Sequence, residues 1–418
     1  MSQADHIWDE LDVTFSRWGL RDIPFTESAS SLRQSQLAQV FTGRESELRE
    51  VLNLFRGRDR RRVLVYGWFG IGKTAFLLEV LGVLRRKAKG TLAAWVSLPQ
   101  GTDLATAALV ALAREMPDDE WAQEQLNLMG LRPRKPARKR REKIKAGISG
   151  FGGETEDETI PAGRPQFAAL SFEDLLARAR AKHERVVIAL DDLDKQDPAR
   201  VRELLRDAQG VLKGDAWFML TGHPSGLTRD LLTRDLGLFD LAVELKPLDP
   251  PTVHRLLVNY LNSARPANAR RDPDDSRAVY PFTAEAAQQL CARSEGVPRW
   301  INRLASYALL RAAKLQADLI TTDVLEQGLA YADQQLRGQA SLTAEDYYIL
   351  ELVLEKGILS DESLTLHDLE RVQMHEFSEI LPRLEKLVQL DLVRRLPSER
   401  AATYKPSPLL SVKGAREG

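Results

Sequence analysis

The sequence predicts an α/β protein: a doubly wound parallel sheet, followed by an α-helical lid and a small C-terminal domain. Apolar runs typical of buried strands alternate with stretches of helical periodicity up to about residue 245. Such alternation favours a parallel sheet with helices on both faces. From residue 251 to about residue 331 the pattern is helical, and from residue 341 it changes again. A chain of 418 residues is long enough for these separate parts.

The predicted elements follow one another in a regular order. Strands are expected at residues 62–66, 91–98, 185–191, 216–221 and 241–245. Helices are expected at residues 46–55, 75–84, 104–116, 172–183 and 201–212. The first of these helices carries Leu48, Val51, Leu52 and Phe55 on one stripe, the spacing of a helix with one buried face. A sheet of this kind binds its ligand at the carboxyl ends of the strands.

Four regions follow from these patterns: an N-terminal arm (1–40), an α/β core (41–248), a helical lid (249–338) and a C-terminal domain (339–418). Within the arm, residues 18–25 mix apolar side chains with Gly and Pro, and we expect them to pack on the segment that follows. A loop at residues 263–280 interrupts the lid. The C-terminal domain has three helical stretches, at 344–356, 366–371 and 375–388, and then a hairpin turning at 397–401. Three helices and a hairpin are the outline of a winged helix.

Composition narrows the class of protein. The chain is 43% apolar and 28% charged, which is ordinary for a globular protein. Its formal net charge of −1 gives no overall electrostatic attraction to nucleic acid. Its only cysteine, Cys291, excludes an internal disulfide and suits a reducing compartment; we expect a buried thiol on a helix. No signal peptide and no membrane span are recognised in the sequence. We expect a cytoplasmic protein.

A glycine-rich loop, Gly67-Trp-Phe-Gly-Ile-Gly-Lys73-Thr74, stands between a predicted strand and a predicted helix. This context makes the G-x-x-x-x-G-K-[ST] pattern typical of a P-loop. Gly67, Gly70 and Gly72 allow backbone N–H groups to point at phosphate oxygens, and the positive end of the helix adds to that field. Lys73 would reach the β- and γ-phosphates, and Thr74 would ligate Mg²⁺. The sequence therefore predicts binding of a nucleoside triphosphate.

Carboxylates follow the third predicted strand. Asp191 is suited to hold Mg²⁺, directly or through water, and Asp192 to orient the attacking water. Asp194 has either a role there or a role as the cap of the next helix.

Polar residues after the next strand are candidates as well. Thr221 is suited to contact the γ-phosphate or water, whereas His223 is interpreted as structural rather than as a base. Arg229 and Arg234 precede the last strand and could supply a cation to a neighbouring subunit's site, or be solvated surface residues.

An insertion at about residues 130–165 breaks the α/β pattern. Residues 131–145 hold nine basic side chains against one glutamate, and an acidic run follows a glycine-rich stretch. Two interpretations stay open: a contact to a nucleic-acid phosphate backbone, or a solvated loop neutralised by its own acidic half.

With these motifs in order, the chain resembles AAA+ ATPases of the initiator and origin-recognition type, with relatives among transposition regulators and STAND-like ATPases. Residues 67–74 resemble Walker A and residues 190–194 resemble Walker B, while Thr221 falls at sensor 1. Residues 41–45 are similar to the family's adenine-contacting motif, and residues 296–303 to its sensor 2 helix. The arm before residue 41 looks more like the transposition-regulator branch. Asp192 departs from the family's usual Glu, and Thr221 from the initiators' usual Asn.

The resemblance implies specific site residues. The nucleotide site would comprise Phe41, Gly43, Arg44, Gly67, Phe69, Gly70, Ile71, Gly72, Lys73, Thr74, Ala75 and Arg299. Mg²⁺ would be held by Thr74 and Asp191. Catalysis would rest on Lys73, Asp192 and Thr221, with Arg299 touching the γ-phosphate from the lid. Arg234, or as second choice Arg229, would be the arginine finger of a neighbouring protomer.

The leading hypothesis is an ATPase that assembles with ATP, hydrolyses it to reset, and acts on DNA through the winged helix and the insertion. The helix at 375–388 has Arg383 and Lys386 but also three glutamates, so it is not strongly basic. The alternative is therefore a STAND-like signalling or defence switch that docks a protein partner through the winged helix. A metabolic kinase is not favoured, because a lid arginine and a winged helix serve no small-molecule acceptor.

Overall fold

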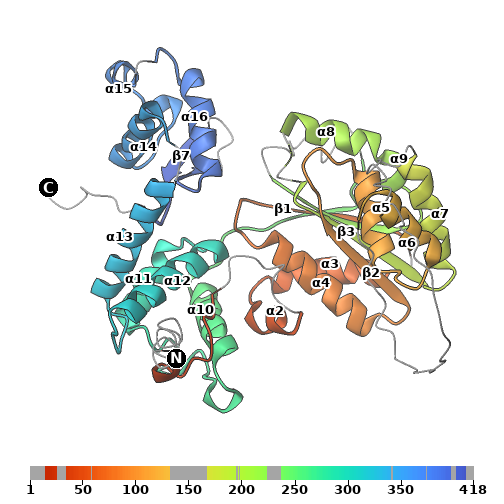
Figure 1. Ribbon diagram of the computed structural model, residues 1–418, viewed down its shortest axis with the longest axis horizontal. Coiled ribbons are helices and arrows are strands. Elements are labelled where there is room, and N and C mark those ends of the chain that lie inside the picture. The colour runs from red at the N-terminus through yellow and green to blue at the C-terminus, as the bar shows by residue number, and fades with distance from the viewer. Residues whose placement is uncertain are drawn as a thin grey trace, which may run out of the picture. The chain divides into compact units, whose positions relative to one another are not determined.

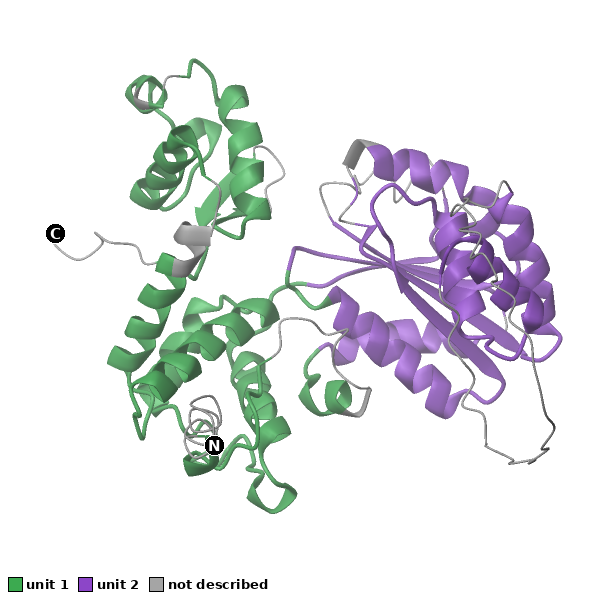
Figure 2. Ribbon diagram, viewed as in Figure 1, with its two compact units in different colours: residues 1–43, 70–72, 246–418 green, residues 44–69, 73–245 purple. Residues whose placement is uncertain are grey.

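The computed structural model describes residues 15–25, 34–57, 59–131, 167–193, 196, 198–223, 237–339, 342–372, 374–396 and 402–410. These residues form two compact units, coloured separately in Figure 2. One, the sheet unit, comprises residues 44–69 and 73–245. The other, the helical unit, comprises residues 1–43, 70–72 and 246–418. Residues 70–72 of the glycine-rich loop therefore group with the helical unit, while the rest of the loop groups with the sheet unit.

The sheet unit is built on five parallel strands, as the sequence predicts. Their order across the sheet is β2 (Thr91–Ser97), β3 (Arg185–Asp191), β4 (Trp217–Gly222), β1 (Arg62–Tyr66) and β5 (Leu241–Glu244). Every neighbouring pair is parallel. The strands are almost wholly apolar because both faces of the sheet are covered: Leu64 and Val63, adjacent on β1, are both fully buried.

Helices cover the two faces (Figure 1). The even-numbered strand residues Leu64, Ile188 and Phe218 share one apolar cluster with helices on one face. That face carries α5 (Leu104–Arg114), α6 (Glu120–Leu128), α7 (Ala168–Arg180), α8 (Pro198–Asp207) and α9 (Gln209–Leu212). Helices α3 (Glu45–Arg56) and α4 (Lys73–Lys87) lie on the other. The sequence analysis does not predict helix α6. The single helix expected at 201–212 is divided into α8 and α9.

The helical unit contains α2 (Gln34–Val40), α10 (Pro250–Ala264), the short η4 (Ala267–Ala269), α11 (Ala284–Arg293), α12 (Pro298–Lys314) and α13 (Thr322–Gln339). Trp18 of the arm is 2% exposed and belongs to the core of these helices. Its indole N–H donates to the carbonyl of Asp318 at 3.1 Å. The arm thus packs on the lid helices, which lie some 300 residues further along the chain. Cys291 lies on α11 as expected, but is only partly buried.

The C-terminal module, residues 342–410, has the elements that the sequence predicts. It contains α14 (Ala344–Lys356), the short η5 (Asp361–Ser363), α15 (Leu366–Arg371) and α16 (Phe377–Gln389). Strands β6 (Val393–Leu396) and β7 (Thr403–Pro406) pair antiparallel as a hairpin. Tyr404 of β7 is fully buried among the apolar residues of α14 and α16. Thr343 and Asp346 cap α14 reciprocally, which accounts for where this helix begins.

Candidate nucleotide site

The glycine-rich loop leaves the carboxyl end of β1, between β4 and β5, and leads into α4 at Lys73. The Gly67 N–H donates to the carbonyl of Gly222 at 3.3 Å, which ties the base of the loop to the end of β4. The loop thus lies at the carboxyl edge of the sheet, where the sequence places it. Thr74 and Ala75 follow in the first turn of α4, both partly buried.

Lys73 is 7% exposed, and its ammonium group is turned back onto its own loop. Nζ donates to the carbonyls of Gly67 at 2.8 Å and Trp68 at 3.2 Å. It also lies 5.5 Å from the centre of the Phe69 ring, a cation–π distance. A buried cation held by two carbonyl dipoles and a ring is a ready partner for a phosphate, because an anion offers a stronger charge-assisted bond.

A chain of hydrogen bonds links the predicted metal and catalytic residues. The Thr221 hydroxyl donates to Asp191 Oδ1 at 2.7 Å and accepts from the backbone N–H of Asp192 at 2.9 Å. The Thr74 hydroxyl also bonds to Asp191. Adjacent strands β3 and β4 therefore bring Asp191, Asp192 and Thr221 together beside the first turn of α4.

Asp191 is suited to a cation. It is 2% exposed, and burial together with the neighbouring Asp192 raises its pKa, although the bonds from Thr221 and Thr74 oppose that shift. Its second oxygen, Oδ2, is buried and meets no hydrogen-bond donor among the described residues. An unsatisfied carboxylate oxygen beside a threonine hydroxyl fits the oxygen ligands that Mg²⁺ prefers. No cluster of three or more His, Cys, Asp or Glu side chains suited to a metal occurs in the described part of the chain.

Ser97 is a site residue that the sequence analysis missed. It ends β2 in register with Asp191 of β3, and its hydroxyl donates to Asp192 Oδ2. Asp192 adopts a left-handed backbone conformation, with φ of 65°, which short polar residues tolerate best. In the sequence, Ser97 is recognisable only as a lone polar residue near the end of an apolar strand. Its role as a partner of Asp192 follows only from the placement of β2 beside β3.

Two aromatic residues of the loop enclose His223. The His223 ring stacks on Phe69 with centroids 4.9 Å apart and meets the edge of Trp68 at 4.7 Å. His223 is 7% exposed, whereas Phe69 is 45% exposed. The interpretation of His223 as a structural residue agrees with this packing: it fixes the end of β4 against the loop.

Residues 41–45, which are similar to an adenine-contacting motif, lie between α2 and α3 in the chain. Phe41 is partly buried and donates its N–H to the carbonyl of Leu37 at 2.8 Å. Gly43 has a φ of 72°, and a Cβ there would come within 2.8 Å of a Thr252 methyl group on α10. Arg44 occupies the N-cap position of α3 without a capping bond from its side chain, and it pairs with Glu47 at 3.5 Å. Burial lowers the pKa of Arg44, and Glu47 opposes this shift.

Arg299, the predicted sensor arginine, is engaged at both its backbone and its side chain. Its backbone N–H donates to the Gly70 carbonyl at 3.2 Å. Its guanidinium pairs with Asp391 of the C-terminal module at 3.3 Å. Of the other loop residues in this unit, Ile71 is buried and Gly72 partly buried. Asp194, Arg229, Arg234 and nearly all of the 130–165 insertion lie outside the described residues.

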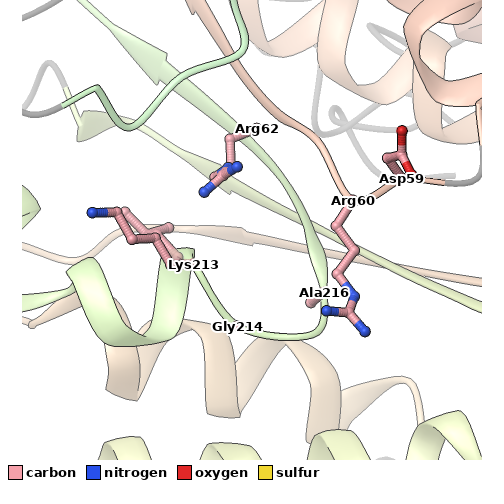
Figure 3. Close-up of a pocket in the computed structure, with 7 residues that line it drawn as sticks. Asp59, Arg60, Arg62, Lys213, Gly214 and Ala216 are labelled. Carbon is pink, nitrogen blue, oxygen red and sulfur yellow. The ribbon is translucent and has the colours of Figure 1, made fainter.

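A cavity of about 390 Å³ opens at the other end of the sheet, where β1 and β4 begin. Arg60, Arg62 and Lys213 line it, together with Asp59 (Figure 3). Asp240 pairs with Arg62 at 3.1 Å, and Asp215 pairs with Arg60. This cavity lies at the opposite end of β1 from the glycine-rich loop, and we assign no part of the nucleotide site to it.

Part of the chain is similar to a known protein family. Residues 40–213 match the AAA ATPase domain family. No curated protein matched the sequence. Among solved structures, the ORC1 protein of Aeropyrum pernix in complex with DNA aligns with a TM-score of 0.50 and 16% identity, over 90% of this chain and 93% of that one.

Two further structures align over similar shares. They are the A. pernix ORC2 protein in its ADP form (TM-score 0.44, 14% identity, 88% and 89% coverage) and the Thermotoga maritima RuvB Holliday junction branch migration motor (0.40, 16%, 90% and 94%). At such identities the likeness to ORC1 is one of fold alone, that of a P-loop NTPase sheet followed by helices. Among the described residues, no helix combines the length and hydrophobicity of a membrane crossing.

Proposed function

We propose that this chain binds ATP with Mg²⁺ and hydrolyses it at the site around the glycine-rich loop, and the match of residues 40–213 to the AAA ATPase domain family supports this. The observation that carries this proposal is the chain from Thr74 through Asp191 and Thr221 to the Asp192 backbone, set beside the loop that holds Lys73. It joins the first turn of α4 to the ends of two strands, and so brings together the proposed ligands of Mg²⁺ and the carboxylate proposed to orient water.

Each residue then has a defined task. Lys73 leaves the carbonyls of Gly67 and Trp68 for the β- and γ-phosphates. Asp191 and Thr74 would hold Mg²⁺, which neutralises charge that develops on the phosphates. Asp192, whose carboxylate Ser97 orients, would accept a hydrogen bond from the attacking water, and Thr221 would keep both aspartates in place. Arg299 provides a cation for the γ-phosphate from the lid.

ATP hydrolysis by the purified chain tests this proposal. We expect hydrolysis that depends on Mg²⁺, is lost in Lys73→Ala and falls strongly in Asp192→Asn, where ATP still binds. Lys213→Ala provides a matched control, because this lysine lies at the opposite end of the sheet. Unchanged hydrolysis in Lys73→Ala would overturn the proposal.

We further propose that ATP drives assembly of several protomers and that the assembly acts on DNA. The order of motifs supports this, as does the C-terminal module, which we interpret as a winged helix. In such an assembly Arg234, or Arg229, would complete the site of the next protomer. DNA binding measured at two salt concentrations, with ATP, ADP or no nucleotide, tests it: the expected binding requires ATP and weakens with salt. DNA binding that depends neither on the nucleotide nor on the salt concentration would contradict this proposal.

One observation favours the alternative, a STAND-like switch that docks a protein partner. The two basic residues of α16 are occupied within the module: Arg383 and Lys386 both pair with Asp346, at 3.2 and 2.5 Å. Basic side chains neutralised in this way add little attraction for a phosphate backbone. Absence of DNA binding under every condition, with a stable ADP-bound monomer, would select this alternative.

A further inference from the structure

Arg299 connects the glycine-rich loop with the C-terminal module. Its backbone N–H holds the carbonyl of Gly70, three residues before Lys73 in the chain. Gly70 has a φ of 77°, and a Cβ there would lie 2.7 Å from the Arg299 Cβ, so only glycine allows this approach. The backbone of Arg299 is therefore fixed at the loop, whatever its side chain does.

The Arg299 side chain shares its partner with a second arginine. Asp391 Oδ2 accepts from Arg303 at 2.7 Å and from Arg299 at 3.3 Å. The Arg303 side chain is 9% exposed, whereas that of Arg299 is 38% exposed. The longer and more exposed ion pair is the one that can break without stranding a buried charge, because Arg303 stays on Asp391.

The position of Asp391 is rigidly set. It lies in the turn between α16 and β6, with a left-handed φ of 58°. Backbone bonds from Asp391 to Val388 at 3.0 Å and from Leu392 to Leu387 at 2.9 Å close this turn. The distance from Asp391 to the arginines of α12 therefore depends on the position of the C-terminal module.

Other contacts hold the module on the lid without Arg299. Glu295 pairs with Arg394 at 2.5 Å and Lys405 at 2.7 Å. Arg293 donates to the carbonyls of Pro408 at 2.7 Å and Leu410 at 3.1 Å. Loss of the Arg299–Asp391 pair alone would leave these bonds in place.

We propose that Asp391 is a positioning residue that competes with the γ-phosphate of ATP for the guanidinium of Arg299. The inference rests on the proposed ATPase function and adds a route by which the C-terminal module senses nucleotide. ATP draws Arg299 away from Asp391, and ADP, with no γ-phosphate, leaves the pair intact. Because coupling is reciprocal, a partner that binds Asp391 itself and displaces it from Arg299 would strengthen ATP binding.

Equilibrium binding of a non-hydrolysable ATP analogue and of ADP tests this, with Mg²⁺ present, on full-length protein. Asp391→Asn keeps an acceptor for Arg303 but removes the competing charge. We expect the dissociation constant for the ATP analogue to fall about 5-fold, at the low end of allosteric couplings because the pair is partly exposed, with that for ADP unchanged. Glu295→Gln, which weakens the same interface without touching Arg299, is the matched control and should change neither constant.

A double mutant separates positioning from a general loosening of the interface. In an Arg299→Ala background, Asp391→Asn should have no effect on binding of the ATP analogue. An effect that persists there, or one that Glu295→Gln reproduces, or an equal shift for ADP, overturns the inference while the proposed function stands. If the wild type binds no ATP analogue at all, the proposed function fails with it. Thermal unfolding of each variant confirms that it is folded.

Discussion

The hydroxyl of Ser97 donates to the carboxylate of Asp192, across the boundary between two adjacent parallel strands. Asp192 is one carbon shorter than the glutamate usual at the matching position of the AAA+ ATPases that the sequence resembles, so in the proposed site its carboxylate would have less reach toward a water. We propose that the hydrogen bond from Ser97 compensates for that shorter reach by fixing the orientation of the carboxylate.

Replacing Ser97 with alanine should therefore lower kcat with little change in KM. Loss of one orienting hydrogen bond of about 1 kcal/mol corresponds to roughly a 5-fold decrease. Steady-state ATP hydrolysis measures it, and Ser97→Thr, which keeps the hydroxyl, should restore most of the rate. An increase in kcat would instead mean that Ser97 holds Asp192 out of its reacting position.

Replacing Lys73 with alanine should abolish ATP binding rather than merely slow hydrolysis. The variant loses the one lysine of the loop, and its two carbonyl partners would then face the phosphates as uncompensated dipoles. We expect the dissociation constant for ATP to rise at least about 100-fold, which is comparable to losing a buried charge-assisted bond. Titration of fluorescent ATP measures this, and Lys213→Ala should bind as the wild type does.

Asp191→Asn should make the nucleotide-free protein more stable. Burial and Asp192 raise the pKa of Asp191 above its ordinary value, so the fold disfavours its ionised form. A protein with an acid whose folded pKa is raised loses stability progressively as pH rises above that acid's ordinary value of 3.8, and neutralisation by substitution removes this penalty. Thermal unfolding at pH 7 should show a midpoint higher by a few degrees in the variant. Added Mg²⁺ and ATP should stabilise the wild type more than the variant, and an equal response would contradict a metal role for Asp191.

The C-terminal module should become sensitive to acid through Asp346. Burial alone would raise the pKa of this carboxylate, but bonds from Lys386, the Thr343 N–H and Arg383 outweigh it and lower the pKa to about 2. The stabilisation is therefore complete above the ordinary value of 3.8 and is lost as pH falls from about 4 to 2. We expect Asp346→Asn to cost about 2 kcal/mol at pH 7 and almost nothing near pH 2.

Urea unfolding at several pH values measures the Asp346 effect. Glu345→Gln is the matched control: Glu345 is the adjacent residue of α14 and also pairs with Arg383, but its side chain is 55% exposed. It should change stability by less than about 0.5 kcal/mol at any pH. A pH-independent loss in Asp346→Asn would assign its effect to the helix cap rather than to charge.

The sequence by itself determined the elements and the nucleotide loop. Near-continuous apolar runs ending in Asp191 and Thr221 mark parallel strands covered on both faces, and the spacing of Gly67, Gly70, Gly72, Lys73 and Thr74 marks a phosphate loop. These signals are local, because a buried strand and a glycine turn each need particular residues within a few positions. Helix α6 and the break between α8 and α9 were missed where such local signals are short.

Only the tertiary structure decided which distant residues meet. Ser97 faces Asp192 because β2 lies beside β3, although 95 residues separate them. Trp18 packs on the lid, where its side chain joins the apolar cluster formed by α10–α13. Arg299 turns to Asp391 because the C-terminal module lies against α12 in the same compact unit. Ion pairs and buried contacts of this kind depend on the three-dimensional placement of segments, which no local pattern encodes.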